Sequence, residues 1–163
     1  MTTKQQKYLV IRFIDESDFM SRLITWATNS LWCHTEALNR DGTGWTGSHT
    51  GTGVETRNLN WVKPCRERRY AIPVSAKDFN AAHTFLESQH GMGYGYTDII
   101  GLFFHKRVWS PQRVICSQLM VEFMQAAGLQ PLNVLPDFDA LIIPEELHLS
   151  PLFIGHSTSN GKP

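Results

Sequence analysis

The stretch Ser30–Leu38, with the sequence SLWCHTEAL, has the pattern of a half-buried β-strand. Its residues fall into two alternating sets: Leu31, Cys33, Thr35 and Ala37 on one side, and Trp32, His34, Glu36 and Leu38 on the other. Alternation with a period of two is typical of a strand, so His34 and Glu36 are predicted to share one face between two large apolar residues. A polar pair on an otherwise apolar face indicates the wall of a cleft.

The stretch belongs to a series of short strands joined by turns. The sequence predicts strands at residues 7–14, 32–40, 44–48, 53–59, 68–75 and 140–144. The dipeptide Asp41-Gly42 favours a tight turn that folds the second strand back onto the third. Because consecutive strands with short connections pair with each other, we expect an antiparallel sheet.

Three helices are predicted, over residues 17–29, 76–90 and within 110–128. Ser17 and Ser75 are the expected N-caps of the first two, and Asp78 completes a variant of the capping box. Gly91 and Gly128 are expected to end the second and third. Helices that follow a run of antiparallel strands indicate the α+β class, with the sheet packed against the helices.

Length and composition indicate one soluble domain, residues 1–155, followed by a loose tail, residues 156–163. The chain has 163 residues, with 15 basic and 15 acidic side chains. This balance argues against a nucleic-acid partner. No apolar run suits a membrane span or a signal peptide, and three cysteines are too few for a disulfide framework, so we expect a cytoplasmic protein of unknown oligomeric state.

Cys116 is the candidate nucleophile, because the sequence VICSQLM places it near the start of an amphipathic helix. The amide groups at a helix N-terminus stabilise a thiolate. His34 is the candidate base that accepts the thiol proton, and Glu36, two residues along the strand, can orient it. The alternative for Cys116 is a buried thiol that acts as a small apolar side chain.

The segments SLWCHTEALNRDGTGW, YTDIIGLFF and VWSPQRVICSQLM together resemble the circularly permuted branch of the NlpC-type papain-like cysteine hydrolases. In that branch the histidine strand precedes the cysteine helix, as His34 precedes Cys116. The resemblance implies a permuted papain-like fold and an amidase or peptidase that forms an acyl-enzyme on Cys116, without a cofactor. It implies a peptide or acyl substrate, such as a peptidoglycan peptide, and a phage-borne enzyme would fit the missing export signal.

The resemblance places the residue that orients the histidine on the strand after it. There Gly47 has no side chain, so Glu36 is the first choice for this role, and His49 or Ser48 the alternative. Tyr96 and Trp32 are expected to contact substrate.

Three other functions stay open. Relatives in the permuted branch include lipid acyltransferases and thioesterases, and the same scaffold can serve as an inactive binding module. A zinc site would draw on His34, His49 and the three cysteines, but their spacing matches no zinc motif. No metal is therefore expected.

Overall fold

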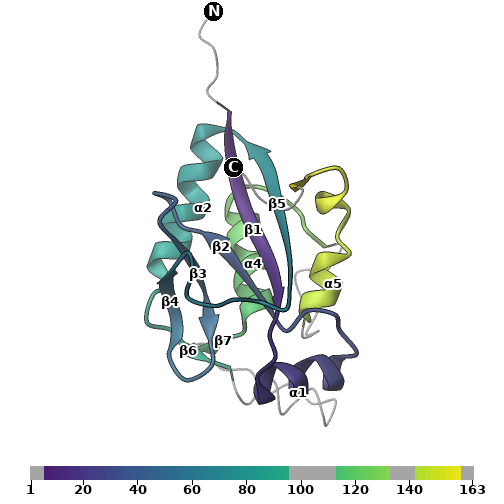
Figure 1. Ribbon diagram of the computed structural model, residues 1–163. Coiled ribbons are helices and arrows are strands. Elements are labelled where there is room, and N and C mark those ends of the chain that lie inside the picture. Colours follow the sequence, from purple (N-terminus) through teal and green to yellow (C-terminus); the bar gives the residue numbers. More distant parts are fainter. Residues whose placement is uncertain (1–5, 96–112, 133–141, 159–163) are drawn as a thin grey trace, which may run out of the picture.

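The computed structural model describes residues 6–95, 113–132 and 142–158. A six-stranded antiparallel sheet carries helices on one face (Figure 1), which confirms the predicted α+β class. Its strands, in spatial order, are β4 (Gly53–Asn58), β3 (Gly44–His49), β2 (His34–Leu38), β1 (Lys7–Asp15), β5 (Arg66–Val74) and β8 (Ser157–Thr158).

The other elements are shorter or lie outside this sheet. The helices are α1 (Phe19–Thr28), α2 (Ala76–Ser88), α4 (Cys116–Ala126), α5 (Pro144–His148) and the 3₁₀ turn η1 (Pro151–Phe153). Two short strands, β6 (Gly93–Tyr94) and β7 (Arg113–Val114), pair in parallel just before α4. In the part of the chain that the structure describes, no helix is long and apolar enough to cross a membrane.

Period-two alternation gives the sheet two unlike faces. Leu9, Ile11 and Phe13 of β1 are fully buried in the core that the sheet forms with α2 and α4. Side chains such as Leu119 and Phe123 of α4 complete this core, and each contributes about 1.5–3 kcal/mol when removed from water. Arg12 projects to the opposite face, where the β4–β5 connection, residues 59–65, runs across the strands (Figure 1).

Helix starts follow the predicted capping chemistry with one correction. Ser75 caps α2 and also bonds the Asp78 carboxylate, as expected. The N-cap of α1 is Asp18 rather than Ser17, because the Asp18 carboxylate accepts hydrogen bonds from the amides of Met20 and Ser21. A carboxylate also suits the positive end of the helix dipole, so it is the better cap.

Two predictions near the C-terminus are wrong in part. Ile142 and Ile143 form no strand; Ile143 is the N-cap of α5, and Pro144 starts that helix, which suits a residue without an amide hydrogen. Residues 140 and 141 lie outside the described residues. The tail also starts later than residue 156, because Ser157 and Thr158 pair with Tyr70 and Arg69 of β5.

Trp32 does not share the face of His34. The strand begins only at His34, so the period-two pattern does not extend back to the tryptophan. Its indole lies in the core, 4% exposed, against Phe13 and His148. Trp32 therefore belongs to the apolar core.

Gly53 and Gly42 give a matched test of how β4 is held. Both have positive φ angles, +81° and +77°, but a Cβ on Gly53 would lie 2.0 Å from the carbonyl oxygen of Met92, whereas one on Gly42 would meet nothing within 4 Å. We expect Gly42→Ala to destabilise the fold by about 1 kcal/mol and Gly53→Ala by about 3 kcal/mol or more. Urea unfolding measures both, and equal losses would contradict the steric argument.

Candidate active site

The paired ends of β2 and β3 bring two histidines together. Ala37 pairs with Thr46 and Leu38 with Trp45, so the antiparallel register places His34, the first residue of β2, opposite His49, the last of β3. Their ring centroids are 4.8 Å apart. Residues far apart in sequence thus meet at one end of the sheet.

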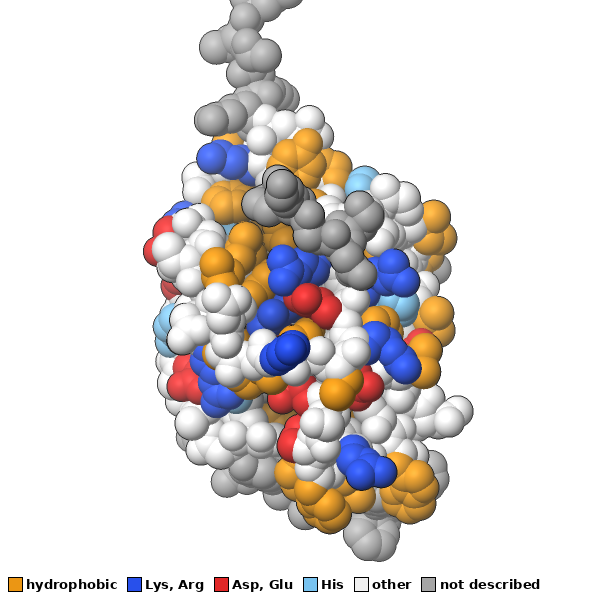
Figure 2. Space-filling model, in the orientation of Figure 1, with side chains coloured by type: hydrophobic (Ala, Val, Ile, Leu, Met, Phe, Trp, Pro, Cys, Tyr) orange, Lys and Arg blue, Asp and Glu red, His pale blue; other side chains and the backbone are white. Residues whose placement is uncertain are grey.

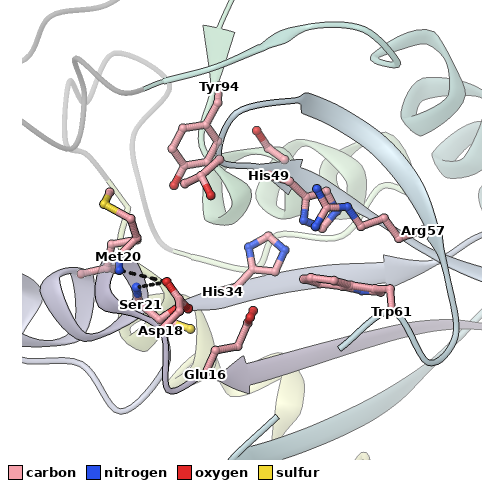
Figure 3. Close-up of a pocket in the computed structure, with 13 residues that line it drawn as sticks. Glu16, Asp18, Met20, Ser21, His34, His49, Arg57, Trp61 and Tyr94 are labelled. Atoms are coloured by element: carbon pink, nitrogen blue, oxygen red, sulfur yellow. Dashed lines mark hydrogen bonds between the residues drawn. The ribbon is translucent and has the colours of Figure 1, made fainter. Parts of the chain in front are cut away.

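A small cavity of about 140 Å³ opens beside these rings. Figure 3 shows His34 near its centre, Glu16 below it, and His49 and Tyr94 above. The cavity is lined by Glu16, Asp18, Met20, Ser21, Ile24, Cys33, His34, Ser48, His49, Thr50, Arg57, Trp61 and Tyr94. Among the residues that the structure describes, Met20 and Ile24 alone contribute aliphatic side chains to the lining, so the cavity suits a compact polar group.

Gly47 is needed for the position of the His34 ring. The register places Gly47 opposite Glu36, and a Cβ there would lie 3.0 Å from the Glu36 Cβ and 3.1 Å from Nε2 of His34. Both distances are shorter than an ordinary van der Waals contact. The imidazole of His34 therefore occupies the space that a side chain at position 47 would need.

Glu36 lies on the same face as His34, as predicted, and is held by other partners. Its Oε1 accepts from Nε of Arg12 at 3.0 Å and lies 2.7 Å from Nη2, and its Oε2 accepts from the indole of Trp61 at 3.3 Å. Burial raises the pKa of Glu36 to about 7, although Arg12 lowers it. The carboxylate is therefore fixed in place, with both oxygens already engaged.

Charged side chains continue this network to the surface of the same face. Arg12 also donates to Glu67 at 3.4 Å, and Glu67 accepts from Arg69 at 2.7 Å. The guanidinium of Arg12 lies 4.3 Å from the ring centre of Trp45. Figure 2 shows basic and acidic side chains interspersed over this face.

Both histidines of the site are neutral at pH 7. Burial lowers the pKa of His34 well below its usual value, and lowers that of His49 to about 4. In each ring the buried Nε2 has no hydrogen-bond partner among the described residues. A buried ring nitrogen without a partner is available to a water molecule, an ion or a substrate group.

Cys116 is the first residue of α4, and Ile115 caps the helix without a side-chain hydrogen bond. The residue is 4% exposed, and burial raises the pKa of its thiol to about 11, whereas the backbone N–H groups of Thr35 and Ser117 lower it. Cys116 does not line the cavity. Cys116 lies next to the lining, because its sulfur accepts from the backbone N–H of Thr35, which directly follows His34. Val114, two residues before Cys116, accepts at its carbonyl from the hydroxyl of Ser48 at 2.6 Å.

The structure therefore brings most of the predicted residues into one region. His34, Ser48 and His49 line the cavity, while Glu36 and Cys116 lie next to it. The hydrogen bonds of the described residues include none between Cys116 and His34. Trp32 lies in the core, away from the cavity, and Tyr96 lies outside the described residues.

Sequence reasoning missed several residues of the site. Arg57 and Trp61 stack over each other, 4.6 Å from guanidinium carbon to ring centre, and Trp61 lies 5.0 Å from the His49 ring. Glu16 and Asp18 form the opposite wall. No sequence motif marks these four residues. The one available signal was that the acidic residues Glu16 and Asp18 closely follow the strand predicted over residues 7–14.

His34, Glu36 and His49 also form a group whose ligand atoms lie within 4.8 Å of one another. Two neutral imidazoles and one carboxylate are ligands that zinc and other divalent metals accept. Cys33 and Cys65 are not part of this group, so the combination of residues differs from the zinc site weighed from the sequence. The positive charge of Arg12 disfavours a metal ion beside Glu36, because Arg12 already neutralises the Glu36 carboxylate.

Comparisons with known proteins identify a similar fold but no family. No protein-family model matches the chain, and no curated protein matches it. Among solved structures it is similar to the metalloprotein yiiX of Escherichia coli O157:H7, a DUF1105 protein. The TM-score is 0.58 at 19% identity, over 77% of this chain and 68% of that one.

These findings correct the predicted family. The resemblance to the permuted NlpC-type hydrolases rested on residue order and short segments, and no family model supports it. The structural similarity is to a DUF1105 metalloprotein. A histidine that precedes a cysteine helix is too general an arrangement to identify a family.

Gly47→Ala tests the assigned position of the His34 ring. The added methyl group would meet Nε2 of His34 at 3.1 Å, so we expect the imidazole to move while the strand still pairs. The imidazole signals of His34 in an NMR spectrum should shift, with less than about 2 kcal/mol lost in stability. Unchanged His34 signals would contradict the assigned ring position.

Proposed function

We propose that this protein is a cysteine hydrolase that cleaves an amide bond through an acyl-enzyme on Cys116. The observation that carries the proposal is the position of Cys116 as first residue of α4, with the N–H groups of Thr35 and Ser117 directed at its sulfur. An uncapped helix N-terminus has unpaired amide hydrogens, which stabilise negative charge on sulfur and on a nearby oxyanion.

His34 is the proposed base. The thiol is protonated in the resting protein, because burial raises its pKa to about 11, and His34 is neutral and so able to accept a proton. Proton transfer gives a thiolate and an imidazolium, and the sulfur then attacks the substrate carbonyl carbon. The imidazolium protonates the leaving amine, and a water molecule, deprotonated by His34, hydrolyses the thioester and restores the thiol.

Glu36 has a positioning role in this proposal. Arg12 and Trp61 hold its carboxylate on the same face as the imidazole, where a partial negative charge favours the imidazolium that forms during the reaction. The His49 ring, 4.8 Å from the His34 ring, is nearer than that of Trp61 and is the alternative for this role.

The lining of the cavity favours a peptide-like amide over a lipid ester. Two carboxyl groups, two imidazoles and a guanidinium surround about 140 Å³. A long acyl chain would have to displace water from these polar groups without replacing its hydrogen bonds. A short polar group can satisfy them.

An electrophilic peptide probe tests the catalytic assignment. We expect a peptidyl acyloxymethyl ketone to label Cys116 and His34→Gln to slow this labelling at least about 100-fold, because the base is removed. Peptide mass spectrometry identifies the labelled residue. Cys65 is exposed and Cys33 is buried, so both serve as internal references for simple accessibility.

Cys65→Ser is the matched control and should leave the labelling of Cys116 unchanged. Labelling confined to Cys65, or labelling of Cys116 that persists at the same rate in His34→Gln, would show that Cys116 is not an activated nucleophile.

A second candidate is binding of a divalent metal by the two histidines. The buried Nε2 atoms of His34 and His49 without partners favour it, and the structurally similar yiiX is a metalloprotein. The imidazoles fit a metal ion, whereas Glu36 fits only if it leaves Arg12. A metal ion bound there would polarise a water or carbonyl oxygen, and His34 and His49 would hold it in place.

Titration with Zn²⁺ distinguishes the two candidates. If the histidines form a metal site, calorimetry should give one ion per chain, and His49→Gln should weaken binding at least about 10-fold. His90→Gln, an exposed histidine of the same chain, is the control. Binding weaker than millimolar, or binding that His49→Gln leaves intact, would exclude this metal site.

A further inference from the structure

Glu16 places a carboxylate on the cavity wall. It directly follows β1, and its carboxyl group points into the cavity toward His34 (Figure 3). The hydrogen bonds and ion pairs of the described residues include none to this carboxylate. Burial and the neighbouring Asp18 raise the pKa of Glu16, whereas the charges of Arg12 and Arg57 lower it.

The cations near Glu16 are already paired with other acids. Arg12 contacts Glu36 and Glu67, and Arg57 lies 2.6 Å from Glu55. His34 and His49 carry no charge at neutral pH. Arg12 and Arg57 act on Glu16 only through their charge from a distance, and neither forms an ion pair with it among the described residues.

Asp18 is not equivalent to Glu16. Its Oδ1 accepts from the amides of Met20 and Ser21 and its Oδ2 from the Ser21 hydroxyl, so both oxygens serve the N-terminus of α1. Asp18 therefore adds negative potential to the cavity, whereas the hydrogen bonds of the described residues leave the carboxylate oxygens of Glu16 available to a ligand.

The opposite wall offers two further polar groups to a ligand in this cavity. His34 and His49 are only 8% and 4% exposed, and each has a buried Nε2 without a partner. A ligand with polar groups at both ends would satisfy the imidazoles on one side and the carboxylate on the other.

We propose that Glu16 binds the ammonium group of the substrate, so that the protein acts on amides with a free primary amine within one residue of the scissile bond. This inference rests on the proposed hydrolase function, and it names its substrate class. Glu16 and the proposed base His34 line the same cavity of about 140 Å³, and Cys116 lies next to it, so an ammonium at Glu16 is close to the carbonyl that reacts.

Two substrates that differ only in that charge test the inference: alanine p-nitroanilide and its N-acetyl derivative. The wild-type protein should cleave the free amine about 30-fold better in kcat/KM, as a charged hydrogen bond allows. Glu16→Gln keeps the shape of the side chain and should reduce this preference to less than about threefold, through KM, with the acetylated substrate unaffected.

Glu87→Gln, which removes a surface carboxylate of α2, is the control and should keep the full preference. A preference that survives Glu16→Gln would overturn the inference. An equal loss with both substrates would also overturn it, because Glu16 would then serve the fold or the chemistry itself.

Binding separates this inference from the hydrolase proposal. If no form cleaves either substrate, alanine amide and N-acetylalanine amide can be titrated into wild-type protein and Glu16→Gln and followed by NMR. If alanine amide binds selectively and Glu16→Gln abolishes this binding, the ammonium site is supported and only the hydrolase proposal fails. Equal binding of both amides would overturn the ammonium site.

Discussion

The buried ion pair between Arg12 and Glu36 is the constraint on which the site depends. These residues face each other on the paired strands β1 and β2, and both are almost completely removed from water. Removal of one partner from such a pair costs about 3–5 kcal/mol, since the other charge stays buried. The pair is thus expensive to break, and it holds Glu36 in one position beside His34.

The ion pair also explains how one sheet carries two different faces. On the helix side, Leu9, Ile11 and Phe13 form an ordinary apolar core. On the other side, Arg12 connects Glu36 to Glu67, and Trp45 and Trp61 shield the charges. Polar groups can be buried there because each charge meets an opposite charge or a donor. The cavity lies at the end of this polar face.

Burial controls the chemistry of the site more than neighbouring charges do. It is the largest cause of the low pKa values of His34 and His49 and of the raised pKa values of Glu36 and Cys116. A neutral imidazole and a protonated thiol are the resting states that general-base activation of the sulfur requires. The same neutral imidazoles are also metal ligands, which is why the geometry supports both candidate functions.

The sequence by itself determined the local elements, because they depend on near neighbours. The alternation in Ser30–Leu38 placed His34 and Glu36 on one face, Ser75 identified the start of α2, and the α+β class followed from the order of elements. Where a nearby alternative existed, local reasoning failed: Asp18 replaced Ser17 as the cap, and the strand pattern did not reach Trp32.

Only the tertiary structure decided what surrounds the site. The register of β2 and β3 pairs His34 with His49 and explains why Gly47 has no side chain. Glu36 turned out to be held by Arg12 and Trp61, which are 24 and 25 residues away in the chain. Such contacts depend on strand order and on how a long connection crosses a sheet, and a single sequence carries no local signal for either.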